Sequence, residues 1–232
     1  MVNRVVVFDL DDTLYPEQTY VKSGFRAVAE ECERLQTGCS EAVFAELWSG
    51  YVSGSRGNAF DTLLMHHPTL AAVLSVDDLV AQYRGHTPKL SFFPGVEPLL
   101  TALKAAGVPL GLITDGHVTG QRHKIAALGL DAWMDLVVVN DQWGREYWKP
   151  HTRGFRVIQD AFSETPSEFV YVADNLGKDF VGPHALGWWT ILLRQPDQVH
   201  ARKELLGDPP HVQVDSIEKL DLVLKQWLRG QS

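Results

Sequence analysis

The sequence predicts an α/β protein with a doubly wound, Rossmann-like parallel sheet and an α-helical domain inserted after the first strand. Two patterns support this fold class. Short apolar runs alternate with amphipathic stretches along most of the chain, which is typical of βαβ units. The connection between the first two apolar runs is much longer than the others, and its periodicity is helical.

The apolar runs are the expected strands. Each is apolar on both faces, as a parallel sheet covered by helices on both sides requires. They span residues 5–10, 108–114, 135–140, 168–174 and 188–194.

The amphipathic stretches between and after these runs are the expected covering helices. They span residues 96–106, 118–128, 152–162, 177–186 and 216–228.

The long connection carries helical periodicity over about residues 17–87. The breakers SGSRGN (53–58) and HHP (66–68) divide it into several helices, and FFPG (92–95) marks the return to the sheet. We therefore expect a catalytic core of residues 1–14 and 90–232 and a helical domain of residues 15–89. An insert after the first strand would lie over the carboxyl edge of the sheet, where open α/β folds bind their ligands.

The acidic composition argues against nucleic acids and anionic membranes as binding partners. The chain has 29 acidic and 21 basic residues and a formal net charge of -8, whereas nucleic acids and anionic membranes demand a basic surface. No apolar run is long enough to span a membrane, and the N-terminus turns acidic too early for a signal peptide. We expect a cytoplasmic protein with Cys32 and Cys39 as free thiols; its oligomeric state is left open.

Polar side chains gather where the expected strands end. In a parallel sheet these ends meet at one edge, so the carboxylates among them would repel one another unless a cation compensates. A hard divalent ion held by oxygen ligands, such as Mg²⁺, is the natural compensation. The residues are Asp9, Asp11, Asp12 and Thr13 after the first strand; Thr114, Asp115 and Gly116 after the second; Lys149 after the third; and Asp174 and Asp179 after the fourth.

Mg²⁺ with a lysine and a hydroxyl can hold a phosphoryl group. One carboxylate can attack phosphorus and form an aspartyl phosphate, and a second carboxylate two residues later can protonate the leaving oxygen. The residues alone therefore favour magnesium-dependent phosphoryl transfer.

Four segments, in the order FDLDDTLYP, LITDG, WKP and VADNLGKDF, resemble the signature motifs of the haloacid dehalogenase superfamily. The resemblance spans nearly the whole chain and implies that the helical insert is a small mobile cap. The superfamily's dehalogenases lack an acid at the position of Asp11, whereas its phosphatases and mutases carry Asp there. The resemblance therefore implies phosphate chemistry.

Matched by position, the resemblance implies roles for the acidic residues. Asp9 would be the nucleophile and a magnesium ligand. Asp11 would be the general acid and base and would touch the metal through its backbone carbonyl. Asp174 would be the other carboxylate ligand, and Asp179 would lie in or just outside the metal's coordination shell.

The resemblance also implies that Thr114, Lys149 and the backbone amides of Asp115 and Gly116 bind phosphoryl oxygens. Asp115 stands where the motif often has Asn, so we expect only its amide to face the phosphate. The fourth motif commonly has Gly where this chain has Ala173, and we expect the extra methyl group to be tolerated.

The expected function is a magnesium-dependent phosphomonoesterase acting on a small phosphorylated metabolite, such as a sugar phosphate or nucleotide. Three alternatives remain open: a phosphomutase of the same superfamily, a non-catalytic phospho-ligand-binding protein and a receiver-like signalling module. Mutases of the superfamily tend to carry an apolar residue at the position of Thr13, and receivers are shorter and lack a cap.

Two further expectations concern electrostatics. We expect Asp9 to be ionised, with a low pKa beside the metal, and the surroundings of Asp11 to favour its neutral form. The basic trio Arg122, His123 and Lys124 is expected on a solvated helix face.

Overall fold

The computed structural model describes residues 4–55, 57–162, 165, 168–201 and 203–230. Within them, six parallel strands form one sheet in the order β3-β2-β1-β4-β5-β6, which confirms the predicted fold class. The strands are β1 (Val5–Phe8), β2 (Leu110–Thr114), β3 (Leu136–Val139), β4 (Phe169–Ala173), β5 (Trp189–Leu193) and β6 (Val212–Val214).

Strand β1 lies in the middle of the sheet. Its residue Val6 is in register with Leu110 of β2 on one side and with Val170 of β4 on the other. The strand order reverses at this point, and open parallel sheets bind ligands in the crevice outside such a reversal. The residues that follow β1 therefore emerge where a binding site is expected.

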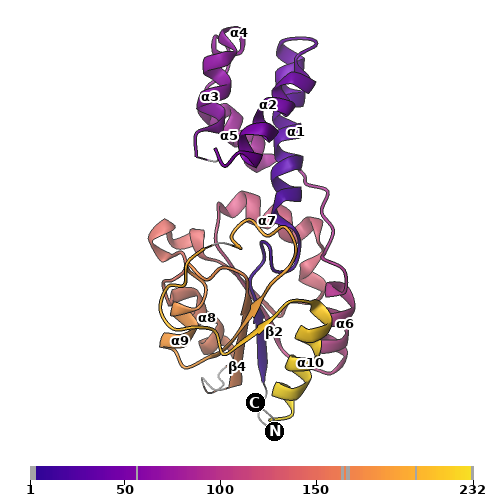
Figure 1. The fold of residues 1–232 in the computed structure, drawn as a ribbon, viewed down its shortest axis with the longest axis vertical. Coiled ribbons are helices and arrows are strands. Elements are labelled where there is room, and N and C mark those ends of the chain that lie inside the picture. The colour runs from indigo at the N-terminus through magenta and orange to yellow at the C-terminus, as the bar shows by residue number, and fades with distance from the viewer. Residues whose placement is uncertain (1–3, 56, 163–164, 166–167, 202, 231–232) are drawn as a thin grey trace.

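Helices cover both faces of the sheet (Figure 1). Val6 and Phe8 point into one apolar layer, under α6, α7 and α10, whereas Val5 and Val7 point into the other, under α8 and α9. The bounds are α6 (Val96–Ala105), α7 (Val118–Ala127), α8 (Arg153–Phe162), α9 (Val181–Ala185) and α10 (Ile217–Leu228), with short 3-10 helices at Leu130–Ala132, Asn140–Trp143 and Arg145–Tyr147.

The long connection after β1 forms a helical insert, which stands above the carboxyl edge of the sheet in Figure 1. It has an apolar core of its own, centred on Phe25, Val28 and Leu63 and including the free thiols of Cys32 and Cys39. Its helices are α1 (Glu17–Leu35), α2 (Ser40–Val52), α3 (Ala59–His66), α4 (Pro68–Ala71) and α5 (Val76–Gly85).

Asp12 fixes the start of the helical insert. It has a left-handed backbone conformation, with φ 55°. Its carboxylate accepts a hydrogen bond from the Glu17 amide (2.8 Å) and another from the Val199 amide (2.5 Å), and Val199 packs against the core of the insert. Asp12 thus ties the entry to the insert to the segment after β5.

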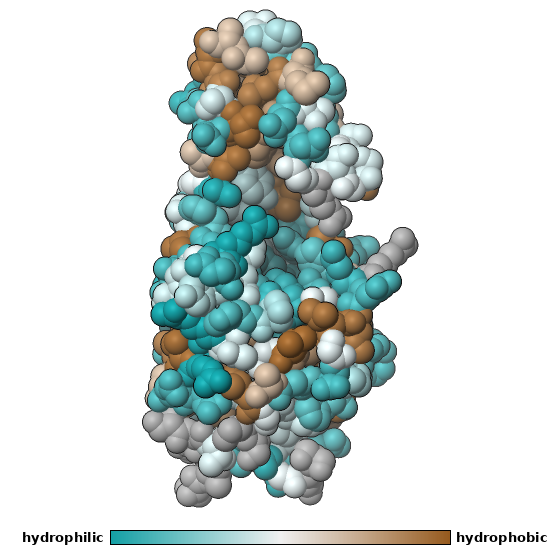
Figure 2. Space-filling view, turned by 90° about the vertical axis from the view of Figure 1, so that its left-hand side faces the viewer, coloured by the Kyte–Doolittle hydropathy of each residue, from teal (hydrophilic) through white to brown (hydrophobic). Residues whose placement is uncertain are grey.

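On the face drawn in Figure 2, apolar side chains gather on the helical insert, whereas the core below it is mainly hydrophilic with smaller apolar patches. Within the described part of the chain, no helix combines the length and apolar character needed to cross a membrane.

Two details differ from the sequence-based expectation. The short strand β6, which has only three residues and lies at the sheet edge, was not predicted. The helix expected over 177–186 begins only at Val181, because residues 175–179 form turns in which the Lys178 and Asp179 amides bond to the Asn175 carbonyl.

Candidate active site

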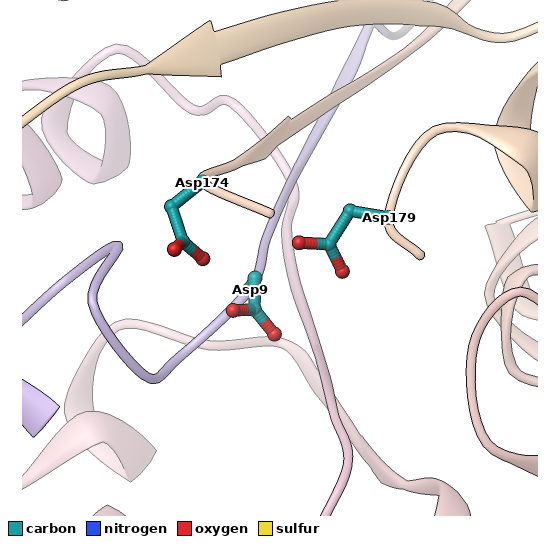
Figure 3. Close-up of side chains that lie close together, drawn as sticks. All are labelled: Asp9, Asp174 and Asp179. Atoms are coloured by element: carbon teal, nitrogen blue, oxygen red, sulfur yellow. The ribbon is translucent and has the colours of Figure 1, made fainter. Parts of the chain in front are cut away.

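Three buried carboxylates meet at the carboxyl edge of the sheet. Asp9 follows β1 directly, Asp174 follows β4, and Asp179 lies in the turn beyond it; Figure 3 shows the three side chains converging. One oxygen from each residue lies within 4.8 Å of the others. Adjacent parallel strands bring these residues together, as the sequence predicts for the strand ends.

Lys149 lies among these carboxylates and is fully buried. Its ammonium Nζ is 2.5 Å from Asp9 Oδ1 and 2.8 Å from Asp179 Oδ1. It also donates a hydrogen bond to the Tyr171 hydroxyl (3.0 Å). The ammonium thus contacts two of the three carboxylates, and Asp174 has no ion pair among the described residues, so negative charge is left in excess.

The residues fit a hard divalent cation. Asp174 Oδ2 is buried and has no hydrogen-bond partner among the described residues. Burial raises the pKa of Asp9 to about 7 against the opposing charge of Lys149, and burial together with the charge of Asp179 raises the pKa of Asp174 well above its usual value. The protein groups alone therefore do not give Asp9 the expected low pKa. A bound cation would reverse this shift.

Asp11 has a different environment. Its Oδ1 accepts hydrogen bonds from Lys124 Nζ (2.7 Å) and from the Tyr15 hydroxyl, and its Oδ2 accepts one from Gln121 Nε2 (2.9 Å). Burial alone would raise the pKa of Asp11, but the Lys124 charge and these hydrogen bonds lower it below the usual value. The expectation that the surroundings of Asp11 favour its neutral form is therefore wrong for the protein by itself.

Lys124 also corrects the expectation for the basic trio. Its side chain is only 6% exposed, because this face of α7 packs against Asp11 and Tyr20. Arg122, by contrast, is exposed.

The end of β2 supplies the opposite side of the site. Thr114 Oγ1 accepts a hydrogen bond from Gln121 Nε2 (2.5 Å), and Gly116 has a positive φ of 120°, which suits glycine. The Asp115 carboxylate accepts hydrogen bonds from Asn140 Nδ2 (2.8 Å), the Lys149 amide (3.1 Å) and Lys178 Nζ (3.0 Å). Its negative charge is thus bound by protein donors.

The structure also gives the surroundings of other residues named from the sequence. Thr13 is buried, and its Oγ1 lies 3.5 Å from Asp9 Oδ2. Ala173 ends β4 within the apolar layer under α8 and α9. His66 and His67 both bond to the Glu46 carboxylate.

The sequence analysis did not assign to the site five residues that contact its carboxylates or Lys149: Gln121, Lys124, Tyr15, Lys178 and Tyr171. A signal existed for two of them, because Gln121 and Lys124 are three residues apart and therefore share one face of a helix that follows the Thr114 turn. The other three are recognisable only from the folded structure.

The amino-acid sequence matches a known protein family. Residues 6–192 match the family model for haloacid dehalogenase-like hydrolases. A glyceraldehyde 3-phosphate phosphatase from Methanopyrus kandleri is 30% identical over 95% of this chain and 97% of its own length. A ribulose-1,5-bisphosphate 5-phosphatase from Halopiger xanaduensis is 28% identical over 84% of this chain and 87% of its own.

A solved structure has a similar fold. The magnesium-bound hydrolase YfnB from Bacillus subtilis aligns with a TM-score of 0.69 at 20% sequence identity, over 97% of this chain and 99% of its own. From the extent of the family match and the similarity to full-length relatives, the chain belongs to the haloacid dehalogenase-like hydrolase family.

Proposed function

We propose that the protein is a magnesium-dependent phosphatase that hydrolyses a small phosphorylated metabolite through an aspartyl phosphate on Asp9. The observation that carries the proposal is the position of Asp9, whose carboxylate contacts the Lys149 ammonium and lies close to the carboxylates of Asp174 and Asp179 at the carboxyl edge of the sheet. Thr114, at the end of the neighbouring strand, supplies a hydroxyl on the other side.

In the first half-reaction, an Asp9 carboxylate oxygen attacks phosphorus, and the bond from phosphorus to the leaving oxygen breaks. The proton that the leaving oxygen needs comes from the Asp11 carboxyl, which must take up a proton before this step because its contacts with Lys124 and Gln121 lower its pKa and favour the ionised form. Lys149, the Thr114 hydroxyl and the amides of Asp115 and Gly116 bind the other phosphoryl oxygens and stabilise their charge.

In the second half-reaction, a water molecule attacks phosphorus and gives its proton to the Asp11 carboxylate. The bond from phosphorus to Asp9 breaks, which releases inorganic phosphate and restores the carboxylate. The contacts of Asp11 with Lys124 and Gln121 suit this step, because they stabilise the charged form that accepts a proton.

The carboxylates of Asp9 and Asp174 and the backbone carbonyl of Asp11 would hold Mg²⁺, with Asp179 in or just outside the shell. When bound, Mg²⁺ neutralises charge on the phosphoryl group and the carboxylates. The buried, unpartnered Asp174 Oδ2 supports this assignment.

Residues 15–89 are proposed as a cap that covers the site. A pocket of about 360 Å³ opens between α1, α3, α5 and the segment after β5, with Glu17, Phe25, Phe60, Tyr83 and His200 among its lining residues. This volume suits a small molecule. Glu17 also lies near Asp11, whose charge adds to the effect of burial and raises the pKa of Glu17 to about 7. The pocket is therefore the proposed place for the leaving group.

The relatives narrow the substrate class. Their names include glyceraldehyde 3-phosphate, ribulose-1,5-bisphosphate and pyrimidine 5'-nucleotides as substrates. A sugar phosphate or a nucleotide is accordingly the proposed substrate.

The test is phosphate release from a panel of sugar phosphates and nucleotides, with Mg²⁺ and with chelator, for the wild type and Asp9→Asn. We expect Mg²⁺-dependent release from one or a few small esters and none from Asp9→Asn. Full activity in chelator would contradict the metal assignment. Turnover of phosphorylated protein without turnover of any small ester would contradict a covering cap.

A further inference from the structure

Helix α7 connects Asp11 with the helical insert through one buried ammonium. Lys124 Nζ lies 2.7 Å from Asp11 Oδ1 and 4.3 Å from the centre of the Tyr20 ring. Tyr20 belongs to α1 of the insert, whereas Asp11 and Lys124 belong to the core. The ammonium is therefore held between the carboxylate below it and an aromatic face above it, the geometry of a cation–π contact.

Gln121 lies one turn earlier on the same face of α7. Its amide Nε2 is 2.9 Å from Asp11 Oδ2 and 2.5 Å from Thr114 Oγ1. Because Lys124 and Tyr15 bond to Oδ1, donors hold both oxygens of the carboxylate. This arrangement sets the plane and direction of the Asp11 carboxylate relative to Thr114.

Tyr20 approaches α7 closely at Gly120, and a side chain at this position would force the Tyr20 hydroxyl to shift. A Cβ atom built on Gly120 would lie 2.8 Å from the Tyr20 hydroxyl oxygen. The Tyr20 ring also packs on His86, with ring centres 4.9 Å apart, and the His86 carbonyl is bonded to His123 of α7 (2.9 Å). Tyr20 thus has little freedom while the insert is docked.

We infer that Lys124 is a positioning residue for Asp11 and that Tyr20 holds Lys124 in place when the insert is docked on α7. Docking of the insert then completes the orientation of the acid–base group. The inference rests on the proposed function, since it requires Asp11 to transfer a proton to the leaving oxygen. A purely structural Lys124 would instead affect all substrates equally.

The first experiment compares two substrates: the best alkyl phosphate from the panel, whose leaving oxygen needs a proton, and p-nitrophenyl phosphate, whose leaving group departs without one. Lys124→Met removes the ammonium and keeps the length of the side chain. We expect kcat/KM for the alkyl ester to fall by about 10–10²-fold and that for the aryl ester by less than about threefold. Arg122→Met, on the exposed face of the same helix, is the matched control and should leave both values unchanged.

A second pair of variants tests the coupling to the insert without touching Lys124. Gly120→Ala forces the Tyr20 hydroxyl away and should lower kcat/KM for the alkyl ester by about 3–30-fold, again with a smaller effect on the aryl ester. In the double variant Gly120→Ala with Tyr20→Phe, the hydroxyl is absent and the ring can return, so most of the loss should be recovered.

The possible outcomes distinguish failure of the proposed function from failure of the positioning role of Lys124. A wild type that hydrolyses neither substrate would contradict the proposed function itself. With an active wild type, equal losses on both substrates in Lys124→Met, or no loss on either, would overturn the positioning role. Failure of the Tyr20→Phe change to rescue Gly120→Ala would overturn the coupling to the insert.

Discussion

Replacing Lys149 by Met tests the electrostatics of the site through protein stability. The Lys149 ammonium is fully buried, and its partners Asp9 and Asp179 are at least 95% buried by side chain. Met has a similar length but no charge, so the variant would keep most of the packing. It would leave the two carboxylates without their ammonium partner.

The expected cost follows from these contacts. Removing one partner of a buried ion pair costs about 3–5 kcal/mol, because the remaining charge stays buried and uncompensated. For a chain of this size, about 1 kcal/mol corresponds to about 2–4 °C in Tm. The Tm of Lys149→Met in chelator should therefore lie about 6–20 °C below that of the wild type at pH 8. The difference should shrink toward pH 5, because the pKa of Asp9 is raised to about 7 and its carboxylate is therefore protonated there.

The assay is thermal unfolding followed by circular dichroism, in chelator, at pH 8 and pH 5. Lys104→Met is the matched control, since Lys104 pairs with Asp135 at the surface, where the two side chains are 41% and 36% exposed. An exposed pair contributes at most about 1 kcal/mol, so the control should lose no more than about 4 °C. If Lys149→Met melts within the range of the control, the reasoning is refuted.

Three further predictions concern chemistry, metal binding and packing. Asp9→Asn should abolish turnover. Asp11→Asn should lose about 10²–10⁴-fold on alkyl esters yet still form a phosphoenzyme from an aryl phosphate, and mass spectrometry should locate the phosphate on Asp9. Mg²⁺ should raise Tm more at pH 8 than at pH 5.5. Because the pKa of Asp9 is raised to about 7, the metal-free fold loses stability as the pH rises toward 7, and at lower pH the proton competes with Mg²⁺ for the carboxylate. An equal rise in Tm at the two pH values would count against this reasoning. Gly24→Ala would place Cβ 2.4 Å from the Tyr83 ring and should cost about 1–3 kcal/mol in unfolding free energy, whereas Gly85→Ala, with no atom within 4 Å of its Cβ, should not.

The parts of the site that the sequence predicts are those fixed by strand order. Asp9, Thr114 and Asp174 follow or end three neighbouring parallel strands, so their meeting at one edge follows from the alternation of strands and helices alone. The predicted parallel sheet and its covering helices are confirmed for the same reason. The assigned catalytic roles of these residues, and the boundaries at residues 15 and 89, stay predictions.

The partners of Asp11 could not be predicted in the same way. Helix α7 has the sequence VTGQRHKIAA, in which polar and apolar residues are mixed around the helix, so no apolar stripe indicates which face is buried. Lys124 is buried because Asp11 and the Tyr20 ring surround its ammonium, and both contacts depend on how the insert docks. The spacing of Gln121 and Lys124 indicates that they share one face of a helix, but it does not indicate that this face meets Asp11.

The pairing of charges also indicates where a cation is needed. Asp9 and Asp179 share Lys149, Asp11 has Lys124, and Asp115 has Lys178. These are the lysine-paired carboxylates of the site.

Asp174 lacks such a partner: it has no salt bridge among the described residues, and its Oδ2 is buried without a hydrogen bond. Burial and the charges of Asp179 and Asp9 raise its pKa well above the usual value, so its ionised form destabilises the metal-free fold. Asp174→Asn should therefore melt at a higher temperature than the wild type in chelator, and it should lose most of the Tm increase that Mg²⁺ gives the wild type. A variant that is less stable in chelator, or that keeps the full Mg²⁺ response, would show that the cation is needed elsewhere.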